Sequence, residues 1–452
     1  MDLLEKLFVG RSTSSEPGAP ELLHFARQIG EEKSRIHLRL DPGGEGTLVV
    51  NANRIMHLNP TAALMARMIL DGQGDAGIVR AARRKYHVSE PAVQQDLSAF
   101  RAQLEELIRP DGACPLHDLE IDSTMPFSAR PTAPYRMDLA LTYRCNNDCP
   151  HCYNARPRDY PEMDTAHWKR VLDRLWSLGV PHIVFTGGEP TLRADLPDLI
   201  AHAESLGQIT GLNTNARRLA DPRYVQGLVG SGLDHVQITV ESHDADIHGQ
   251  MVGSKNAFAQ TIEGLKNALD TSLYVMTNTT MLQTNAHTIS ATLDFLADLG
   301  VPTVGLNALI YSGHGLTVGT GLREAQLQDI LDMAAAKTSR RGQRLIWYTP
   351  TQYCEFDPTQ HNLGAKGCTA ALYSMCIESD GNVLPCQSYY QPLGNLLTDT
   401  WSSIWNHELS VRLRERTALP EKCSGCGLAP ACGGGCPLQF QSTALPAAVG
   451  PR

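Results

Sequence analysis

Three closely spaced cysteines constrain this chain more than any other feature. Cys145, Cys149 and Cys152 form a C-x3-C-x2-C run directly after an apolar stretch, Met137 to Tyr143, that predicts a β-strand. A short loop at the end of a strand lets three thiolates converge on one soft metal centre. A [4Fe–4S] cluster has four irons, so three cysteines would leave one iron free to bind a small molecule.

Zinc is the alternative occupant of such a site. A closed structural zinc site uses four protein ligands in a recurring spacing. His151 would have to be the fourth ligand, yet it lies between Cys149 and Cys152, from where it reaches a shared ion poorly. The run therefore favours an iron–sulfur cluster over zinc.

The cysteine run resembles the signature of the radical S-adenosylmethionine (SAM) superfamily. The resemblance implies that SAM chelates the open iron, and that an electron from the cluster splits the sulfonium C–S bond to give a 5′-deoxyadenosyl radical. His151 and Tyr153, which flank the last cysteine, would then lie against the adenine. No residue stands out as the final hydrogen-atom donor or as a general base.

Length, charge and composition limit the other possibilities. The 452 residues suggest two to four domains, and the net charge of −9 disfavours broad nucleic-acid binding. No apolar run approaches the ~18 residues of a membrane span, and the polar start is no signal peptide. Twelve cysteines without such a signal favour metal ligation over disulfides. We expect a cytoplasmic protein with neither a membrane nor a nucleic-acid partner.

Strand and helix patterns alternate from residue 136 to residue 345. Repeated βα units predict a parallel sheet curled into a barrel or part of one. The superfamily resemblance implies a partial (β/α)6 barrel that is open where the substrate docks. The six strands are expected at residues 138–143, 182–186, 208–213, 235–240, 274–281 and 303–309.

Polar motifs follow these strands at the edge where the active sites of such barrels cluster. Gly187-Gly188-Glu189-Pro190 resembles the superfamily element whose backbone carbonyl and glutamate receive the SAM ammonium. By the same resemblance, ribose and methionyl contacts are expected from Asn213, Thr239 and Glu241. The alternative for each is a polar strand-end residue that caps a helix.

One motif departs from the superfamily pattern. Many members carry His-Asp-x-x-Arg-Gly after this strand, and the arginine reaches the SAM carboxylate. Here the sequence reads His243-Asp-Ala-Asp-Ile-His248-Gly249. The resemblance therefore does not supply that contact.

Eight further cysteines lie in the last hundred residues. Seven of them resemble the SPASM domain, an auxiliary-cluster module of peptide-modifying radical SAM enzymes, here over residues 346–440. The matched cysteines, all implied as metal ligands, are Cys368, Cys376, Cys386, Cys423, Cys426, Cys432 and Cys436. Asp380-Gly381 predicts a hairpin, and only a three-residue loop would put Cys376 and Cys386 on one face, as shared ligation requires.

The number of auxiliary [4Fe–4S] clusters stays open at one or two. Two clusters need eight protein ligands, and the matched positions number seven. Relatives with two clusters usually carry another cysteine after the C-x3-C pair, and none lies between Cys436 and Arg452. Cys354 is a candidate for the eighth ligand. The alternatives are a non-cysteine ligand, an open site, or a single auxiliary cluster.

Residues 31–110 predict three short strands followed by three helices, a small winged-helix arrangement. The segment from His57-Leu58-Asn59 to Leu70-Asp71-Gly72 resembles the PqqD-like peptide chaperone of quinone-cofactor biosynthesis, also called the RiPP recognition element (RiPP: ribosomally made, modified peptide). The resemblance implies binding of a precursor peptide. A basic run that includes Arg83 and Arg84 leaves a DNA-reading winged helix as one alternative, although such runs are more often solvated helix faces, and a purely structural appendage is another.

The remaining segments carry weaker signals. Residues 1–30 predict a weakly patterned extension with a loose stretch from Gly10 to Pro20. Residues 111–135 predict a linker that contains Cys114, and residues 441–452 predict a tail.

Together these features predict a radical SAM enzyme, oxidoreductase-like, that modifies a ribosomally synthesised precursor peptide by hydrogen abstraction, with a crosslink or a related change as the outcome. An electron donor such as flavodoxin or ferredoxin is implied. One alternative is maturation of a small-molecule cofactor such as a tetrapyrrole. Another is an iron–sulfur DNA-binding sensor, which would not need the SAM motifs.

Overall fold

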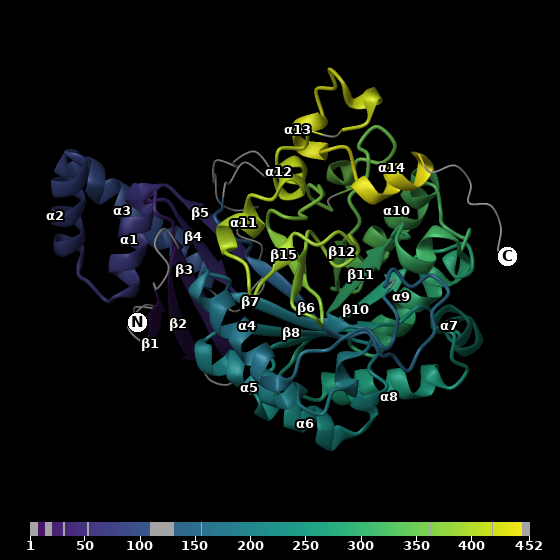
Figure 1. The fold of residues 1–452 in the computed structure, drawn as a ribbon. Coiled ribbons are helices and arrows are strands. Elements are labelled where there is room, and N and C mark those ends of the chain that lie inside the picture. Colours follow the sequence, from purple (N-terminus) through teal and green to yellow (C-terminus); the bar gives the residue numbers. More distant parts are fainter. Residues whose placement is uncertain are drawn as a thin grey trace.

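The computed structural model contains two sheets, each flanked by helices (Figure 1). Among the residues it describes, no helix combines the length and the apolar character that crossing a bilayer requires. The described residues are 8–13, 20–29, 32–51, 54–108, 131–154, 156–361, 363–417 and 419–444.

The N-terminal sheet has the strand order β1-β2-β3-β4-β5 and is antiparallel throughout. The strands predicted near residues 35–40, 47–51 and 54–58 are present, and two more precede them. The five strands are β1 Phe8–Thr13, β2 Glu21–Ile29, β3 Glu32–Leu40, β4 Gly46–Val50 and β5 Arg54–Leu58. Part of the stretch expected to be loose is therefore strand.

β2 was not predicted from the sequence because both of its faces are covered. Leu23 and Phe25 face the helices of the domain, whereas Leu22, on the opposite face, is also fully buried. A strand covered on both faces loses the alternation of apolar and polar residues that identifies a half-buried strand.

Three helices pack on one face of this sheet: α1 Pro60–Leu70, α2 Asp75–Tyr86 and α3 Glu90–Ile108. Asn59 caps α1 by accepting a hydrogen bond from the Ala62 N–H at 2.9 Å, and Pro60 occupies the first helical position. Leu97, Phe100 and Leu104 of α3 are buried in the core of this domain.

The other face of the sheet docks onto the second part of the molecule. Arg39 Nη1 of β3 donates to the Ala133 carbonyl at 2.8 Å, and His37 Nε2 lies 2.7 Å from the Gly207 carbonyl. Arg35 Nε donates to Asp234 Oδ1 at 2.8 Å, and Arg35 also pairs with Glu204. The N-terminal domain is thus packed against the larger sheet through buried polar contacts.

The larger sheet contains seven parallel strands in chain order, and β6 to β11 correspond to the six predicted ones. β12 adds a strand that the sequence did not predict. The bounds are β6 Arg136–Thr142, β7 His182–Gly187, β8 Ile209–Thr214, β9 His235–Thr239, β10 Tyr274–Thr280, β11 Thr303–Asn307 and β12 Arg344–Trp347.

Helices cover the outer face of these strands and share one large apolar core with it (Figure 1). Their bounds are α4 Thr165–Ser177, α5 Leu196–Leu206, α6 Pro222–Gly230, α7 Ala245–Val252, α8 Ala257–Leu269, α9 Ile289–Asp298 and α10 Glu324–Arg340. The polar residues at the ends of the strands are not covered by these helices and can form a site.

The C-terminal segment extends the same sheet on the far side of β6. β13 Ser374–Ile377 runs parallel to β6, and β14 Asn382–Leu384 and β15 Gly394–Asn395 follow antiparallel. Ile377 pairs with Val383, and the Glu378 N–H donates to the Asn382 carbonyl at 2.8 Å. These pairings leave three residues in the loop, as predicted, and Gly381 in it has φ +92°. The chain continues through α11 Trp401–Trp405, α12 Glu408–Arg414, α13 Ala429–Cys432 and α14 Pro437–Ala444.

Candidate active site and metal centres

A cavity of about 530 Å³ lies at the C-terminal ends of the parallel strands. It collects every residue that the sequence assigned to the first metal centre and to SAM. Those lining residues are Cys145, Cys149, Cys152, His151, Tyr153, Gly187, Gly188, Glu189, Asn213, Thr239 and Glu241. The structure thus joins motifs from β6, β7, β8 and β9 in one space.

The cysteine loop is held in place by its own backbone and by Arg158. The Asn147 N–H points to Cys145 Sγ at 3.4 Å, and Arg158 donates to the carbonyls of Cys145 and, at 2.6 Å, of Asn147. Burial raises the pKa of the Cys145, Cys149 and Cys152 thiols. The thiols are therefore protonated at neutral pH, and a metal that binds them must displace those protons.

The two glycines of the Gly-Gly-Glu-Pro motif are required by close backbone packing. Gly187 has φ +129°, and a Cβ there would overlap the Thr142 carbonyl. A Cβ on Gly188 would overlap the Arg144 carbonyl. The motif therefore lies directly against the cysteine loop, and Gly188 N–H donates to the Thr142 carbonyl at 2.7 Å.

The Glu189 carboxylate is fully engaged by the protein. Oε1 accepts from the Thr191 hydroxyl at 2.6 Å, from the Thr191 N–H at 3.1 Å and from the Thr214 hydroxyl at 2.7 Å. Oε2 accepts from the Asn215 N–H at 2.8 Å. Four donors fill the acceptor sites of one carboxylate, so this side chain ties the end of β7 to the end of β8.

Glu241 has different surroundings and retains one polar neighbour that faces the cavity. Its Oε1 lies 3.1 Å from His151 Nε2, and its Oε2 accepts from the Thr280 N–H at 2.8 Å. His151 Nδ1 is buried and has no hydrogen-bond partner among the described residues. A buried polar atom without a partner in a ligand-sized cavity fits a bound polar ligand, which here would be SAM.

His248, the residue before Gly249 in the departing motif, does not line the cavity. Its Nδ1 accepts from the Glu241 N–H at 3.3 Å, and its ring packs edge-to-face on Phe258 at 5.6 Å between ring centres. Burial lowers the pKa of His248, so the ring is neutral at pH 7. His248 supports the strand end that carries Glu241.

Several residues of this cavity were not predicted from the sequence. Asn278 of β10 and Asn307 of β11 line it, and Asn307 Nδ2 donates to Asn278 Oδ1 at 3.0 Å. Both lie toward the C-terminal ends of their strands, the same position that identified Asn213. That signal was sufficient to find them.

The hairpin of β13 and β14 is locked to the cysteine loop by a buried carboxylate. Glu378 accepts two hydrogen bonds from Arg156, at 2.6 and 2.9 Å, and a third from the Tyr143 hydroxyl at 2.9 Å. A bidentate arginine–carboxylate pair holds both partners in one geometry. The first cavity and the C-terminal segment are therefore one structural unit.

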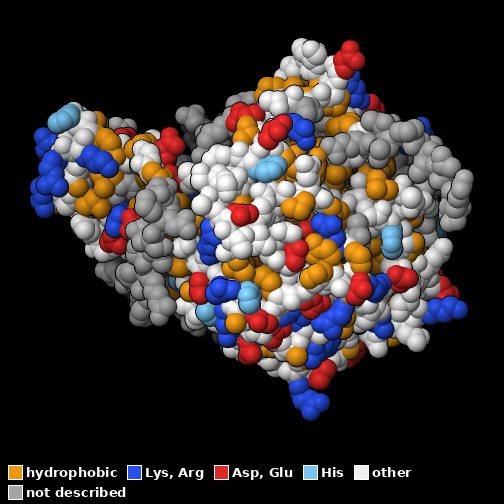
Figure 2. All heavy atoms as spheres, in the orientation of Figure 1, with side chains coloured by type: hydrophobic (Ala, Val, Ile, Leu, Met, Phe, Trp, Pro, Cys, Tyr) orange, Lys and Arg blue, Asp and Glu red, His pale blue; other side chains and the backbone are white. Residues whose placement is uncertain are grey.

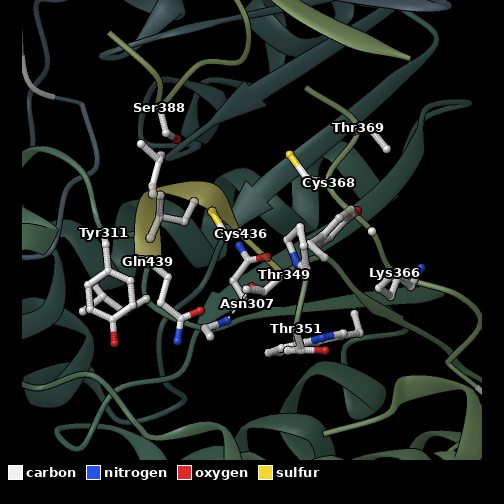
Figure 3. A pocket seen from close by; sticks show the side chains of 18 of the residues that line it. Asn307, Tyr311, Thr349, Thr351, Lys366, Cys368, Thr369, Ser388, Cys436 and Gln439 are labelled. Atoms are coloured by element: carbon white, nitrogen blue, oxygen red, sulfur yellow. Dashed lines mark hydrogen bonds between the residues drawn. The ribbon is translucent and has the colours of Figure 1, made fainter. Parts of the chain in front are cut away.

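A second cavity of about 440 Å³ holds three of the C-terminal cysteines, Cys368, Cys386 and Cys436. Figure 3 shows Cys368 and Cys436 close together in its wall. Burial and the neighbouring Cys368 raise the pKa of the Cys436 thiol to about 12, and the same causes raise that of Cys386. Asn307, Ala308 and Ile310 line both cavities, so the two spaces are neighbours at the end of β11.

The structure divides the seven predicted C-terminal ligands into separate groups. Cys423, Cys426 and Cys432 lie around α13, outside both cavities. Cys376 is fully buried with Ala140, Tyr143 and Leu384 and does not line the cavity of Cys368. Its thiol is nevertheless a neighbour of Cys386, which contributes to raising the pKa of Cys376, as expected for two cysteines on one face of the hairpin.

Within the described residues, no three His, Cys, Asp or Glu side chains are close enough to share a single metal ion. The cysteine ligands of an iron–sulfur cluster each bind a different iron, so they lie further apart than the ligands of one ion. The donor sets of both cavities, three thiols each, fit a cluster in their chemistry.

Family models match three parts of this chain. Residues 139–309 match the radical SAM superfamily, residues 368–427 an iron–sulfur cluster-binding domain named SPASM, and residues 37–107 the coenzyme PQQ synthesis protein D. The PqqA peptide cyclase of Xanthomonas euvesicatoria pv. vesicatoria is 31% identical over 318 residues, which cover 68% of this chain and 83% of that protein. The chain belongs to the radical SAM superfamily and carries its SAM and iron–sulfur chemistry.

Similar proteins point to a more particular group. A second PqqA peptide cyclase, from Xanthomonas campestris pv. campestris strain 8004, is 31% identical over 70% of this chain and 85% of its own length. Among solved structures, Streptococcus suis SuiB bound to SAM aligns with a TM-score of 0.67 at 19% identity, over 92% of this chain and 96% of SuiB. SuiB bound to its precursor peptide SuiA aligns with a TM-score of 0.65 at 18% identity, over 90% and 95%.

Proposed function

We propose that this radical SAM enzyme modifies a ribosomally synthesised precursor peptide. The observation that carries the proposal is the docking of a PqqD-like domain, through Arg35 and Arg39, onto the barrel that holds the cysteine-lined cavity. The names of its relatives, PqqA peptide cyclase and SuiB with precursor peptide SuiA, support it. In our proposal the chain comprises a peptide-binding domain (31–110), a linker (111–135), a radical SAM barrel (136–345) and a SPASM domain (346–440).

In the first cavity, Cys145, Cys149 and Cys152 would hold the [4Fe–4S] cluster. SAM bound there supplies a 5′-deoxyadenosyl radical when it is reductively cleaved. Asn213 and Thr239 line the cavity at the ends of β8 and β9 and would orient its ribose and methionyl groups. The closed packing of the Gly187-Gly188 segment against the cysteine loop limits the access of water on that side.

In the second cavity, Cys368, Cys386 and Cys436 would hold an auxiliary cluster. Because both cavities share the wall at Asn307 to Ile310, this cluster would lie next to the substrate space. An electron donor such as flavodoxin or ferredoxin would reduce the enzyme. The residue that donates the final hydrogen atom stays unassigned.

The peptide would bind at the edge of the N-terminal sheet. β5 pairs with β4 and is the last strand of the sheet, so its outer edge can accept another strand. Ile55 of β5 is 46% exposed, an unusual degree for a large apolar side chain in a strand. Arg54 Nη1 donates to the Leu107 carbonyl at 2.7 Å, which places the end of α3 beside this edge. A leader bound there would raise the effective concentration of the peptide core near the barrel.

Two experiments test the proposal separately. The triple variant Cys145→Ala, Cys149→Ala, Cys152→Ala should form no 5′-deoxyadenosine from SAM and dithionite; continued formation would refute the assignment of the radical site. Leader peptide from a neighbouring reading frame should bind the full chain in fluorescence anisotropy, and Ile55→Glu should weaken this binding about 10-fold, because an apolar contact of ~1.4 kcal/mol is lost.

The matched control for the binding experiment is Val88→Glu, since Val88 is a similarly exposed apolar residue at 41% but follows α2 away from the edge. Equal effects of both variants would contradict the proposed binding edge. Salt-dependent binding of duplex DNA by the wild-type chain would instead favour a nucleic-acid partner.

A further inference from the structure

The segment from Thr351 to Glu355 lies against the C-terminal cysteine loop, residues 421–436, although about seventy positions separate the two segments in the chain. The Tyr353 N–H donates to Cys432 Sγ at 3.4 Å, and the same sulfur lies 3.6 Å from the Thr351 carbonyl. Gln352 Nε2 donates to the Gly434 carbonyl at 3.4 Å. Three consecutive residues before Cys354 therefore touch the loop.

The residue after Cys354 also contacts this loop. Glu355 Oε1 lies 3.5 Å from Lys422 Nζ, directly before Cys423. The Glu355 N–H and the Phe356 N–H both donate to the Gln352 carbonyl, at 2.8 and 2.9 Å, so Cys354 lies in a tight turn. Cys354 is thus bracketed by contacts with the segment that carries Cys423 and Cys432.

Gly434 connects these contacts to Cys423. Its carbonyl accepts from Gln352, and Cys423 Sγ lies 3.9 Å from the position that a Cβ on Gly434 would take. Cys354, Cys423, Cys426 and Cys432 are thus carried by two segments in contact with each other, and none of the four lines the second cavity.

We infer that Cys354 is the fourth thiolate of a distal iron–sulfur cluster whose other ligands are Cys423, Cys426 and Cys432. Four thiolates complete the coordination of a [4Fe–4S] cluster. The assignment rests on the proposed iron–sulfur role of the C-terminal cysteines and is independent of the peptide substrate. Cys376, which is buried with Ala140, Tyr143 and Leu384, is not part of this set.

The distal cluster can be measured without interference from the radical site. In the background of Cys145→Ala, Cys149→Ala, Cys152→Ala, all iron that remains after anaerobic reconstitution belongs to the C-terminal cysteines. In this background Cys354→Ala should lose about four iron and four sulfide per chain, or about one iron with the appearance of the EPR signal of an oxidised three-iron cluster. Cys426→Ala, a ligand in the same proposed set, should lose a similar amount, and Cys114→Ala should lose none.

The controls distinguish whether the distal cluster exists from whether Cys354 ligates it. If Cys354→Ala keeps the iron, sulfide and EPR spectrum of the background while Cys426→Ala does not, a distal cluster exists and Cys354 does not ligate it. If neither variant loses iron, or if zinc accounts for the metal, the distal cluster itself is refuted. Formation of 5′-deoxyadenosine and leader binding by the otherwise wild-type chain report on the proposed function independently.

A second measurement does not depend on the variants folding. Cys354 is solvent-exposed, so iodoacetamide can reach its thiol unless a cluster occupies it. Mass spectrometry should find Cys354 protected in reconstituted wild-type protein and alkylated after chelation of its iron. Equal alkylation of Cys354 in both samples would overturn the assignment.

Discussion

Two glutamates in the first cavity, Glu189 and Glu241, differ in their hydrogen-bond partners. Glu189 is held by four protein donors, whereas Glu241 shares its carboxylate between the Thr280 N–H and His151. Both are almost completely buried, at 1% exposure. We expect replacement of the first to affect mainly stability, and replacement of the second to affect mainly SAM binding.

For Glu189, the change to Ala should lower the thermal stability of the SAM-free protein. The variant leaves the hydroxyls of Thr191 and Thr214 and the Asn215 N–H without their buried acceptor, and each orphaned group costs about 1–3 kcal/mol. Anaerobic scanning calorimetry would measure the shift of the unfolding transition. An unchanged transition would contradict the structural role of this carboxylate.

For Glu241, the change to Ala should weaken SAM binding about 10-fold, a loss of ~1.4 kcal/mol, because His151 loses the partner that fixes its ring against the cavity. Equilibrium dialysis of the anaerobic reconstituted enzyme would measure it. Glu241→Gln is the matched control, since its amide oxygen can still accept from the Thr280 N–H. Wild-type affinity in the Ala variant would remove Glu241 from the SAM site.

At the scale of elements, β7, β8 and β9 are coupled by a pair of histidines. His182 Nε2 of β7 lies 2.8 Å from His235 Nε2 of β9, across the intervening strand β8. This crossing is possible because β8 carries Gly211 at the same level, where a Cβ would overlap the His235 ring. The glycine is therefore required by a side chain of the neighbouring strand.

Gly211→Ala should destabilise the barrel by about 1–3 kcal/mol, because the added methyl group overpacks this site. In the double variant Gly211→Ala, His235→Ala the methyl group has room. The double variant should therefore be more stable than the sum of the two single effects implies. Chemical denaturation of the four proteins forms a double-mutant cycle, and additive effects would contradict the overlap.

The buried histidines also predict a dependence of stability on pH. Burial lowers the pKa of His37, His182 and His235, the last to about 4. Between about pH 4 and about pH 6.5 the unfolded chain binds protons that the folded chain excludes. The free energy of unfolding therefore falls as the pH falls through this window. Each histidine contributes up to about 1.4 kcal/mol per pH unit. Unfolding transitions measured between pH 7.5 and 5.5 should show this slope, and His235→Asn should reduce it. An unchanged slope in that variant would exclude His235 as a contributor.

The sequence predicted the elements whose patterns are local and missed those that depend on distant contacts. Strands β6 to β11 and the strand-end motifs followed from periodicity and polar residues. β2 lacks an alternating pattern because it is covered on both faces, and β12 is only four residues long. The grouping of cysteines could not be predicted, because Cys354 approaches Cys423 only through the contacts of the Thr351–Glu355 turn.

At the scale of the whole molecule, the N-terminal domain and the barrel meet through buried ion pairs. Figure 1 shows β2 to β5 next to the barrel, with α2 at the outer end of the domain. Arg35 is 3% exposed and pairs with Asp234 and Glu204 of the barrel. Figure 2 shows basic side chains gathered at the outer end of the domain, and Arg80, Arg84 and Lys85 of α2 are exposed. The charged residues of this domain thus serve two surfaces, one buried against the barrel and one in solvent.

This docking changes how the role of the N-terminal domain should be tested. Deleting the domain up to Thr132 would expose Asp234 and Glu204, and it would remove Arg39, which donates to the Ala133 carbonyl of the remaining chain at 2.8 Å. A loss of activity after truncation would therefore mix lost peptide binding with a damaged barrel surface. A single substitution in the interface keeps both domains present and changes only their docking.

Arg35→Ala should uncouple leader binding from peptide modification. The change removes the hydrogen-bonded ion pairs between the buried Arg35 and two partly exposed carboxylates, at a cost of about 1.5–3 kcal/mol at the contact between the two domains. β4 lies between β3, which carries Arg35, and the β5 edge, so leader affinity should stay within 2- to 3-fold of wild type, and SAM cleavage without peptide should continue. Turnover of the full precursor should fall at least 10-fold, because a loosely held domain no longer keeps the peptide core at the cavity.

Arg84→Ala, an exposed change on α2, is the control and should leave turnover unchanged. Wild-type turnover by Arg35→Ala would show that a flexible tether suffices and that the docked geometry has no role in catalysis.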